Sequence, residues 1–291
     1  APRAPRVWDR ARVDLRRARL AVTVAFVVQG ICFAGLVTRI PTLQSRFELS
    51  DGELGLLVGL VPIIAGVGSV LAGALAPRYG SRILLRLCGP LVPLGLVAIG
   101  YAGSVAMLLA GMVVVGFGLG SVDATMNMQG IRVQDDLGRS VVASYYAAFS
   151  LAGLVGAILA SVAAESTLSL GAFFALIAAA TIPFQLFVGR WLLPGHPTVE
   201  VVHSEKGHIN WRPVVLVGIA LMCVYIADSG ASNWSAVYLN DGLGSSEGTA
   251  ALAYGVYAFM TMVGRIVVDR YVDLIGPVPL VRVGGIIAVV A

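Results

Sequence analysis

The stretch SDGELGLLVG, residues 50–59, has a degenerate second copy further along the chain, and this pair decides how the fold is organised. A shift of 196 residues places it on SEGTAALAYG, residues 246–255, and places GSRILLRLCG (80–89) on GPVPLVRVGG (276–285). A constant offset over about forty residues indicates an internal repeat. Both copies run in the same direction, which is the arrangement of transporters built from two related six-helix halves.

The composition indicates a protein that lies in lipid. Hydrophobic residues make up 58% of the 291 residues and charged residues only 12%, and the mean hydropathy is +0.88. A soluble domain keeps about a quarter of its residues charged, whereas a helix of about 20 apolar residues crosses a bilayer. We therefore predict an all-α polytopic membrane protein.

Eight complete spans are expected, with a ninth starting near residue 279. Their predicted ranges are 20–40, 51–77, 83–103, 105–130, 142–164, 168–192, 213–240 and 248–272. Arginines are concentrated in the N-terminal tail and at the ends of the even-numbered spans. Arg265, Arg270 and Arg282 are counted with the end of span 8. This positive-inside pattern predicts a cytoplasmic N-terminus in a multi-pass protein of the bacterial inner membrane. The net charge of +4 thus reflects topology and is no sign of nucleic-acid binding.

The longest polar interruption divides the chain. We predict a six-helix N-terminal half at 1–192, a cytoplasmic linker at 193–212 and the first two to three helices of a second half at 213–291. The linker holds all three histidines, His196, His203 and His208. Their spacing matches no compact ligand pattern, so no metal site is expected.

A turn motif follows span 2 and recurs after span 8. The first copy is GALAPRYGSRILL (73–85) and the second is GRIVVDRYVDLIG (264–276). Glycine permits a sharp turn, and arginines suit a cytoplasmic helix end. The residues that carry this motif are Gly73, Arg78, Gly80 and Arg82 in the first copy and Asp269, Arg270, Asp273 and Gly276 in the second.

These motifs resemble those of the major facilitator superfamily, in which this turn forms part of a cytoplasmic gate. Pro77 stands where the family has an aspartate and Ser81 replaces a basic residue. In the family this aspartate helps to hold the cytoplasmic gate closed, so its absence puts that contact in question for the first half. Three stretches, 33–55, 122–130 and 225–239, resemble a bacterial branch near the fucose–proton symporters. The resemblance implies three further spans. It also argues against a drug antiporter, because FSLAGLVGAILA (149–160) lacks the antiporter signature.

Asp123 is the first candidate for chemistry. It lies about 24 Å into span 4 at 1.5 Å per residue and shares a helix face with Gly116, Gly120 and Asn127. The glycines are expected to let a neighbouring helix approach this face closely. A mid-span carboxylate is costly in lipid and is expected to face the bundle interior. We interpret Asp123 as a proton-coupling residue, with a structural hydrogen bond between helices as the alternative. Asn127 is a candidate for solute binding.

Asp228 in span 7 is the second proton-coupling candidate. Tyr225, Asp228 and Ser232 repeat at helical spacing, and Asn233 and Trp234 follow. An aromatic ring beside hydroxyls and a carboxylate suits a sugar-like solute, so the four residues around Asp228 are predicted to bind substrate. Interfacial anchoring is the alternative for Trp234.

Two weaker substrate-binding candidates lie in span 1. Gln29 is expected to contact solute or another helix, and Arg39 to pair with a carboxylate or to snorkel. Tyr145 and Tyr146 are read as ordinary residues of the aromatic belt. Glu53 and Glu247 are read as helix-capping residues that follow Ser50 and Ser246.

The sequence predicts a secondary active transporter, most simply a proton-coupled one for a small polar solute. No phosphate-binding loop and no nucleophile–base pair is present, so neither an enzyme nor a nucleotide- or cofactor-binding protein is expected. The expected partners are a small solute, protons and the lipid bilayer. Efflux of amphipathic compounds and a non-transporting membrane sensor or assembly protein remain as alternatives. The solute, the direction of transport and the coupling ion are left open.

Overall fold

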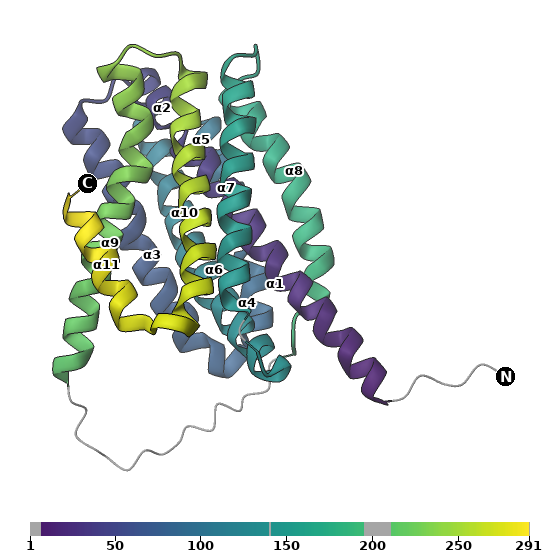
Figure 1. The fold of residues 1–291 in the computed structure, drawn as a ribbon. Helices are drawn as coiled ribbons and strands as arrows, with labels where there is room; N and C mark the ends of the chain where they lie inside the picture. The colour runs from purple at the N-terminus through teal and green to yellow at the C-terminus, as the bar shows by residue number, and fades with distance from the viewer. Residues whose placement is uncertain (1–6, 140, 195–210, 291) are drawn as a thin grey trace.

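The computed structural model describes residues 7–139, 141–194 and 211–290, and these form a bundle of long helices (Figure 1). No strand occurs in these ranges. The helices are α1 (Val7–Val37), α2 (Ile40–Phe47), α3 (Asp51–Tyr79), α4 (Ser81–Cys88), α5 (Leu91–Gly100), α6 (Val105–Leu137), α7 (Val142–Ala164), α8 (Leu170–Val188), α9 (Trp211–Val237), α10 (Glu247–Ile275) and α11 (Pro277–Val290). A 3₁₀ turn (Gly189–Trp191) follows α8, and a π-helical turn (Tyr238–Gly242) follows α9.

Eight helical segments of the described chain are long and apolar enough to cross a membrane, which confirms the predicted number of complete spans. Helices α4 and α5 together make one of them, at Ser81–Gly100. The short apolar stretch Val278–Ile287 lies on α11, where the ninth span was expected to begin. We call the side of the bundle where α1 begins the N-terminal side, and the side that carries α2 the opposite side (Figure 1).

The structure repeats where the sequence repeats. Helices α3 and α10 each have 29 residues, and each ends at a glycine with positive φ, 80° at Gly80 and 84° at Gly276. A side chain other than glycine rarely adopts such a φ. Ser50 caps α3 by accepting from the backbone N–H of Glu53, and Ser246 caps α10 by accepting from that of Thr249. The predicted parallel repeat is therefore a repeat of helix, turn and helix in the structure.

Helices α3 and α6 approach each other closely through glycines. A Cβ placed on Gly116 would lie 2.8 Å from the carbonyl oxygen of Val61, and one on Gly120 would overlap the carbonyl oxygen of Ala65. Small residues allow such backbone contact between membrane helices. The expectation that the glycine face of span 4 receives a neighbouring helix is confirmed, and that neighbour is α3.

Helix α7 lies between the N-terminal helices and the second set. It packs against α1 on one side and α10 on the other, and Figure 1 shows α10 beside α7. Gly156 of α7 meets the backbone of Ile31, since a Cβ there would lie 3.1 Å from its carbonyl oxygen. The α7–α10 contact is the main junction between the two repeats. The predicted linker at 193–212 lies almost wholly outside the described residues, so the domain limits stay a prediction.

Replacing Gly120 with alanine is expected to lower stability by about 1–3 kcal/mol, because the added methyl group collides with the backbone of α3. Thermal unfolding of the purified protein in detergent measures the change. Gly66→Ala is the matched control, since Gly66 is also mid-helix but its Cβ position meets no atom within 4 Å, and it should change stability by no more than about 0.5 kcal/mol. Equal effects of the two variants would contradict the close packing of α3 and α6.

Candidate functional site

Polar side chains from four helices form a group near the α7–α10 contact, and all of them are buried or half-buried except Tyr225, which is 67% exposed. We call this group the polar cluster; its members come from α6, α7, α9 and α10, and they are Asp123, Asn127, Tyr146, Ser150, Tyr225, Asp228, Tyr257 and Arg265. All of them lie within predicted membrane spans. Charged and polar groups at such depth mark solute or ion pathways.

Asp123 and Asn127 lie one turn apart on α6, as their spacing predicted. The amide nitrogen of Asn127 donates to the backbone oxygen of Asp123 at 2.9 Å and lies 3.4 Å from its carboxylate Oδ1. The hydroxyl of Tyr146 donates to Oδ1 of Asn127 at 3.1 Å. The amide therefore connects the carboxylate of α6 to a tyrosine of α7.

The interpretation of Tyr145 and Tyr146 as belt residues is wrong. Tyr145 is 1% exposed and stacks on Phe26 with 5.4 Å between ring centroids. Tyr146 contacts the edge of the same ring at 5.1 Å while its hydroxyl bonds Asn127. Both tyrosines face inward because α1 packs along this side of α7.

Asp228 on α9 is held by a residue that the sequence reasoning missed. The hydroxyl of Tyr257, on α10, donates a hydrogen bond to Oδ1 of Asp228. Tyr257 belongs to a stripe on α10 with Tyr254, Thr261 and Arg265, spaced by three and four residues. The same spacing test that identified the stripe around Asp228 would have found this second stripe.

Arg265, which the charge count placed near the end of span 8, is half-buried and turns toward α7. It lies two residues before the end of the apolar segment Glu247–Val267. Its Nη1 donates to the backbone oxygen of Tyr146 at 2.9 Å and to the hydroxyl of Ser150 at 2.7 Å. The guanidinium carbon lies 5.3 Å from the centre of the Tyr146 ring. Arg265 thus joins α10 to α7 inside the bundle.

The two aspartates predicted from separate helices are both linked to the polar stripe of α10. Asp228 accepts a hydrogen bond from Tyr257, and Asp123 is connected through Asn127 and Tyr146 to Arg265. Asp123 comes from the first repeat, whereas Asp228 and Arg265 come from the second. The cluster therefore contains two carboxylates and one guanidinium across the junction of the repeats.

The other predicted substrate-binding residues lie around this cluster or along α9. Gln29 is buried on α1, and its Oε1 has no hydrogen-bond partner among the described residues. Ser232 is buried and Asn233 half-buried, and both bond to Ser229 of their own helix. Trp234 is partly exposed and lies toward α3, where a Cβ on Gly55 would be 3.8 Å from its ring. Of these four residues, only Gln29 presents a buried polar atom without a partner.

Arg39 forms an ion pair on the opposite side of the bundle. Its Nη1 lies 3.3 Å from Oε2 of Glu247, the first residue of α10, and the hydroxyl of Thr42 donates to the same oxygen at 2.7 Å. The Arg39 side chain is 5% exposed and that of Glu247 is 41% exposed. Pairing, one of the two outcomes expected for Arg39, is confirmed. Reading Glu247 as only a capping residue was wrong, because it neutralises a buried guanidinium.

The first turn motif is held by contacts within the N-terminal helices. Ser81 accepts a hydrogen bond at 2.9 Å from the buried Gln129 of α6, and Arg82 donates to the backbone oxygen of Arg190 at 2.8 Å. Arg78 stacks over Tyr79, and a Cβ on Gly73 would meet no atom within 4 Å. In the second motif Gly276 forms the turn, while the side chains of Asp269, Arg270 and Asp273 lie outside the described ones.

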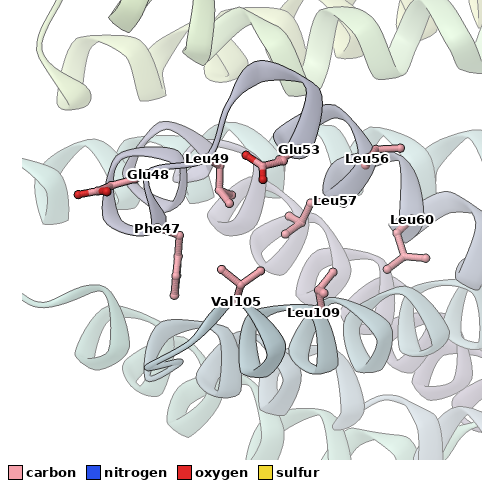
Figure 2. A pocket seen from close by; sticks show the side chains of 9 residues that line it. All are labelled: Phe47, Glu48, Leu49, Glu53, Leu56, Leu57, Leu60, Val105 and Leu109. Atoms are coloured by element: carbon pink, nitrogen blue, oxygen red, sulfur yellow. The ribbon is translucent and has the colours of Figure 1, made fainter.

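A cavity of about 430 Å³ lies elsewhere, on the opposite side of the bundle. Figure 2 shows the leucines of α3 facing Val105 and Leu109 of α6, with Glu48 and Glu53 at the α2–α3 end. Leu109 precedes Asp123 by fourteen residues, or about 21 Å along α6. No predicted site residue lines this cavity, so the polar cluster remains the candidate site. The described residues hold no group of three or more His, Cys, Asp or Glu side chains that could bind a metal ion.

Comparisons with known proteins agree with this architecture. The family model described as Major Facilitator Superfamily matches residues 22–291. The chain is 28% identical to an uncharacterized MFS-type transporter of Yersinia pestis, over 89% of this chain and 67% of that protein. It is 27% identical to the arabinose-proton symporter of Escherichia coli K12, over 69% of this chain and 43% of that protein. The crystal structure of a D-xylose-proton symporter superposes with a TM-score of 0.66 at 15% sequence identity, over 88% of this chain and 69% of that one. The chain thus spans about two thirds or less of the length of these proteins.

Replacing Glu247 with glutamine is expected to lower stability by about 1–3 kcal/mol, because it leaves the buried Arg39 charge without its partner. The double variant Arg39→Gln/Glu247→Gln should lose less than the sum of the single losses. Thermal unfolding in detergent measures all three. Glu48→Gln is the control, since Glu48 is exposed and forms no ion pair among the described residues; additive losses would contradict a coupled pair.

Proposed function

Because the chain belongs to the major facilitator superfamily, we propose that it is a proton-coupled transporter of a small, polar, sugar-like solute that works by alternating access. The observation that carries this proposal is the chain of contacts from Asp123 through Asn127 and Tyr146 to Arg265 of α10, the helix whose Tyr257 bonds Asp228. A 27% identical relative is named as an arabinose-proton symporter, which supports a sugar-like solute.

In this proposal, the two aspartates take up and release the proton. A carboxylate inside a membrane span is costly when it is charged, and protonation removes that cost. Each aspartate has a neutral donor beside it, Asn127 for Asp123 and Tyr257 for Asp228. These donors keep the carboxylates oriented toward the cluster in either protonation state.

Movement of the two repeats against each other would then change which side of the membrane the cluster faces. Contacts across the junction occur at two levels, between Arg39 and Glu247 on the opposite side and between Arg265 and α7 nearer the N-terminal side. Opening either side requires breaking the contacts at that level. We further propose that the N-terminal side is cytoplasmic, in keeping with the arginine distribution, and that the repeats are divided at the linker 193–212.

Solute recognition is assigned to polar groups near the aspartates. Gln29 shares one face of α1 with Phe26 and Phe33, whose rings lie 5.1 Å from Tyr146 and 6.0 Å from Tyr254. Aromatic rings stack on the C–H faces of sugars, and the buried amide of Gln29 offers a hydrogen bond to a hydroxyl. Asn127 and Tyr225 complete the proposed contacts, and Ser232, Asn233 and Trp234 lie further along α9 toward the opposite side.

Asp123→Asn and Asp228→Asn should each abolish uptake driven by a pH gradient, because an amide cannot exchange a proton near neutral pH. The measurement is uptake of labelled sugars by the complete protein in proteoliposomes, with and without an imposed gradient. Asp136→Asn is the control, as Asp136 is an exposed carboxylate at the end of α6. Gradient-driven uptake that survives in both cluster variants would refute the assignment of the proton sites.

A further inference from the structure

We propose that Arg265 is the binding site for an acidic group of the solute, so that the transported solute is a small polyhydroxylated acid such as an aldonic or uronic acid. This inference rests on the proposed function and names the substrate class for the same site. The transport of a neutral sugar does not require the guanidinium of Arg265.

Arg265 has no carboxylate partner among the described side chains, which do not include that of Asp269 one turn later on α10. Among the described residues, the only ion pair within 4 Å is that of Arg39 with Glu247. Arginines within membrane spans ordinarily pair with an acidic side chain or line a substrate pathway. Both hydrogen bonds of the Arg265 guanidinium to described residues come from Nη1, so Nε and Nη2 have no protein partner there.

The two nearby carboxylates have donors of their own. Asp228 accepts from the hydroxyl of Tyr257, and Asp123 lies beside the amide of Asn127. The other groups that experience the charge of Arg265 are the hydroxyls of Tyr146, Tyr225, Tyr254 and Tyr257. Tyrosine is ordinarily neutral at physiological pH. When the aspartates carry the protons of the transport cycle, Arg265 is therefore the net charge of the cluster, and an anion binds favourably.

The geometry suits a planar acidic group. The contacts of Nη1 with Tyr146 and Ser150 fix the guanidinium plane against α7, and the remaining N–H groups form the kind of fork that matches two carboxylate oxygens. The buried amide of Gln29 and the hydroxyl of Tyr225 would receive the solute's hydroxyl groups. Lysine offers a point charge in place of the fork and would not replace arginine fully.

The test compares acids with neutral molecules of the same size. The complete protein in proteoliposomes is supplied at about pH 6.5 with labelled D-gluconate or D-glucuronate, and with D-glucitol or D-glucose as neutral counterparts. We expect the acids to be preferred and Arg265→Gln to reduce their uptake about tenfold or more, the effect of losing a charged hydrogen bond. Uptake of any neutral sugar should change far less. Uptake of the acids that is no faster than that of the neutral sugars would overturn the inference. An equal loss of acid and neutral-sugar uptake in Arg265→Gln would overturn it as well.

Two further variants keep the test valid if Arg265→Gln does not fold. Arg265→Lys and Ser150→Ala should raise the KM for the acid while kcat changes little, because they loosen or reposition the guanidinium and leave the proton sites intact. Arg46→Gln is the matched control, since Arg46 also donates two hydrogen bonds, to the backbone oxygens of Gly100 and Ala102 at 2.8 Å each, but lies on α2. A KM effect of Arg46→Gln equal to that of Arg265→Lys would count against a solute contact.

The same measurements separate this inference from the proposed function. Proton-driven uptake that is lost in Asp228→Asn, but that shows no preference for the acids and no effect of Arg265→Gln on their uptake, would uphold the transporter and reject the acidic solute. Conversely, thermal stabilisation by D-gluconate that disappears in Arg265→Gln, without any flux in proteoliposomes, would uphold the anion site and reject transport. No stabilisation and no uptake with either acid would overturn the inference.

Discussion

The structure depends on one constraint: groups that cannot bond to lipid must find their partners inside the protein. Helices satisfy the backbone in this way, which is why apolar spans so long become helices. The few charged side chains within the spans need partners on other helices. Arg39 pairs with Glu247, which also accepts a hydrogen bond from Thr42, and Asp228 accepts one from Tyr257. Each of these contacts joins parts of the bundle that are distant in sequence.

Close helix contact follows from the same constraint. Lipid tails are as apolar as leucine, so membrane helices gain little from burying leucines against each other, and close packing of small residues contributes instead. Gly116 and Gly120 bring α6 against the backbone of α3, and Gly156 brings α7 against α1. The helices that carry Asp123 and Tyr146 are held in position by these contacts. The members of the polar cluster on α6 and α7 are therefore positioned by close helix contacts.

The contact between α7 and α10 joins the two repeats, and the proposed function depends on it. Arg265 bonds across this junction to Tyr146 and Ser150, and Tyr146 in turn bonds Asn127 beside Asp123. A continuous path of contacts thus runs from a carboxylate of the first repeat to a cation of the second. In the proposed mechanism, this path would carry a change in the charge of Asp123 to the contact between the two repeats.

Periodicity and composition were enough to predict the helical class, the eight spans, the parallel repeat and the glycine face of α6, because each depends on residues close together in the chain or at a fixed offset. They also identified Asp123 and Asp228, since a carboxylate in an apolar span is visible by itself. Only the tertiary structure showed that both aspartates are linked to the polar stripe of α10, that Arg265 turns toward α7, and that Glu247 neutralises Arg39. An arginine near the end of a span has the same sequence pattern whether it snorkels to water or turns inward, and the packing of α7 against α10 decides which occurs.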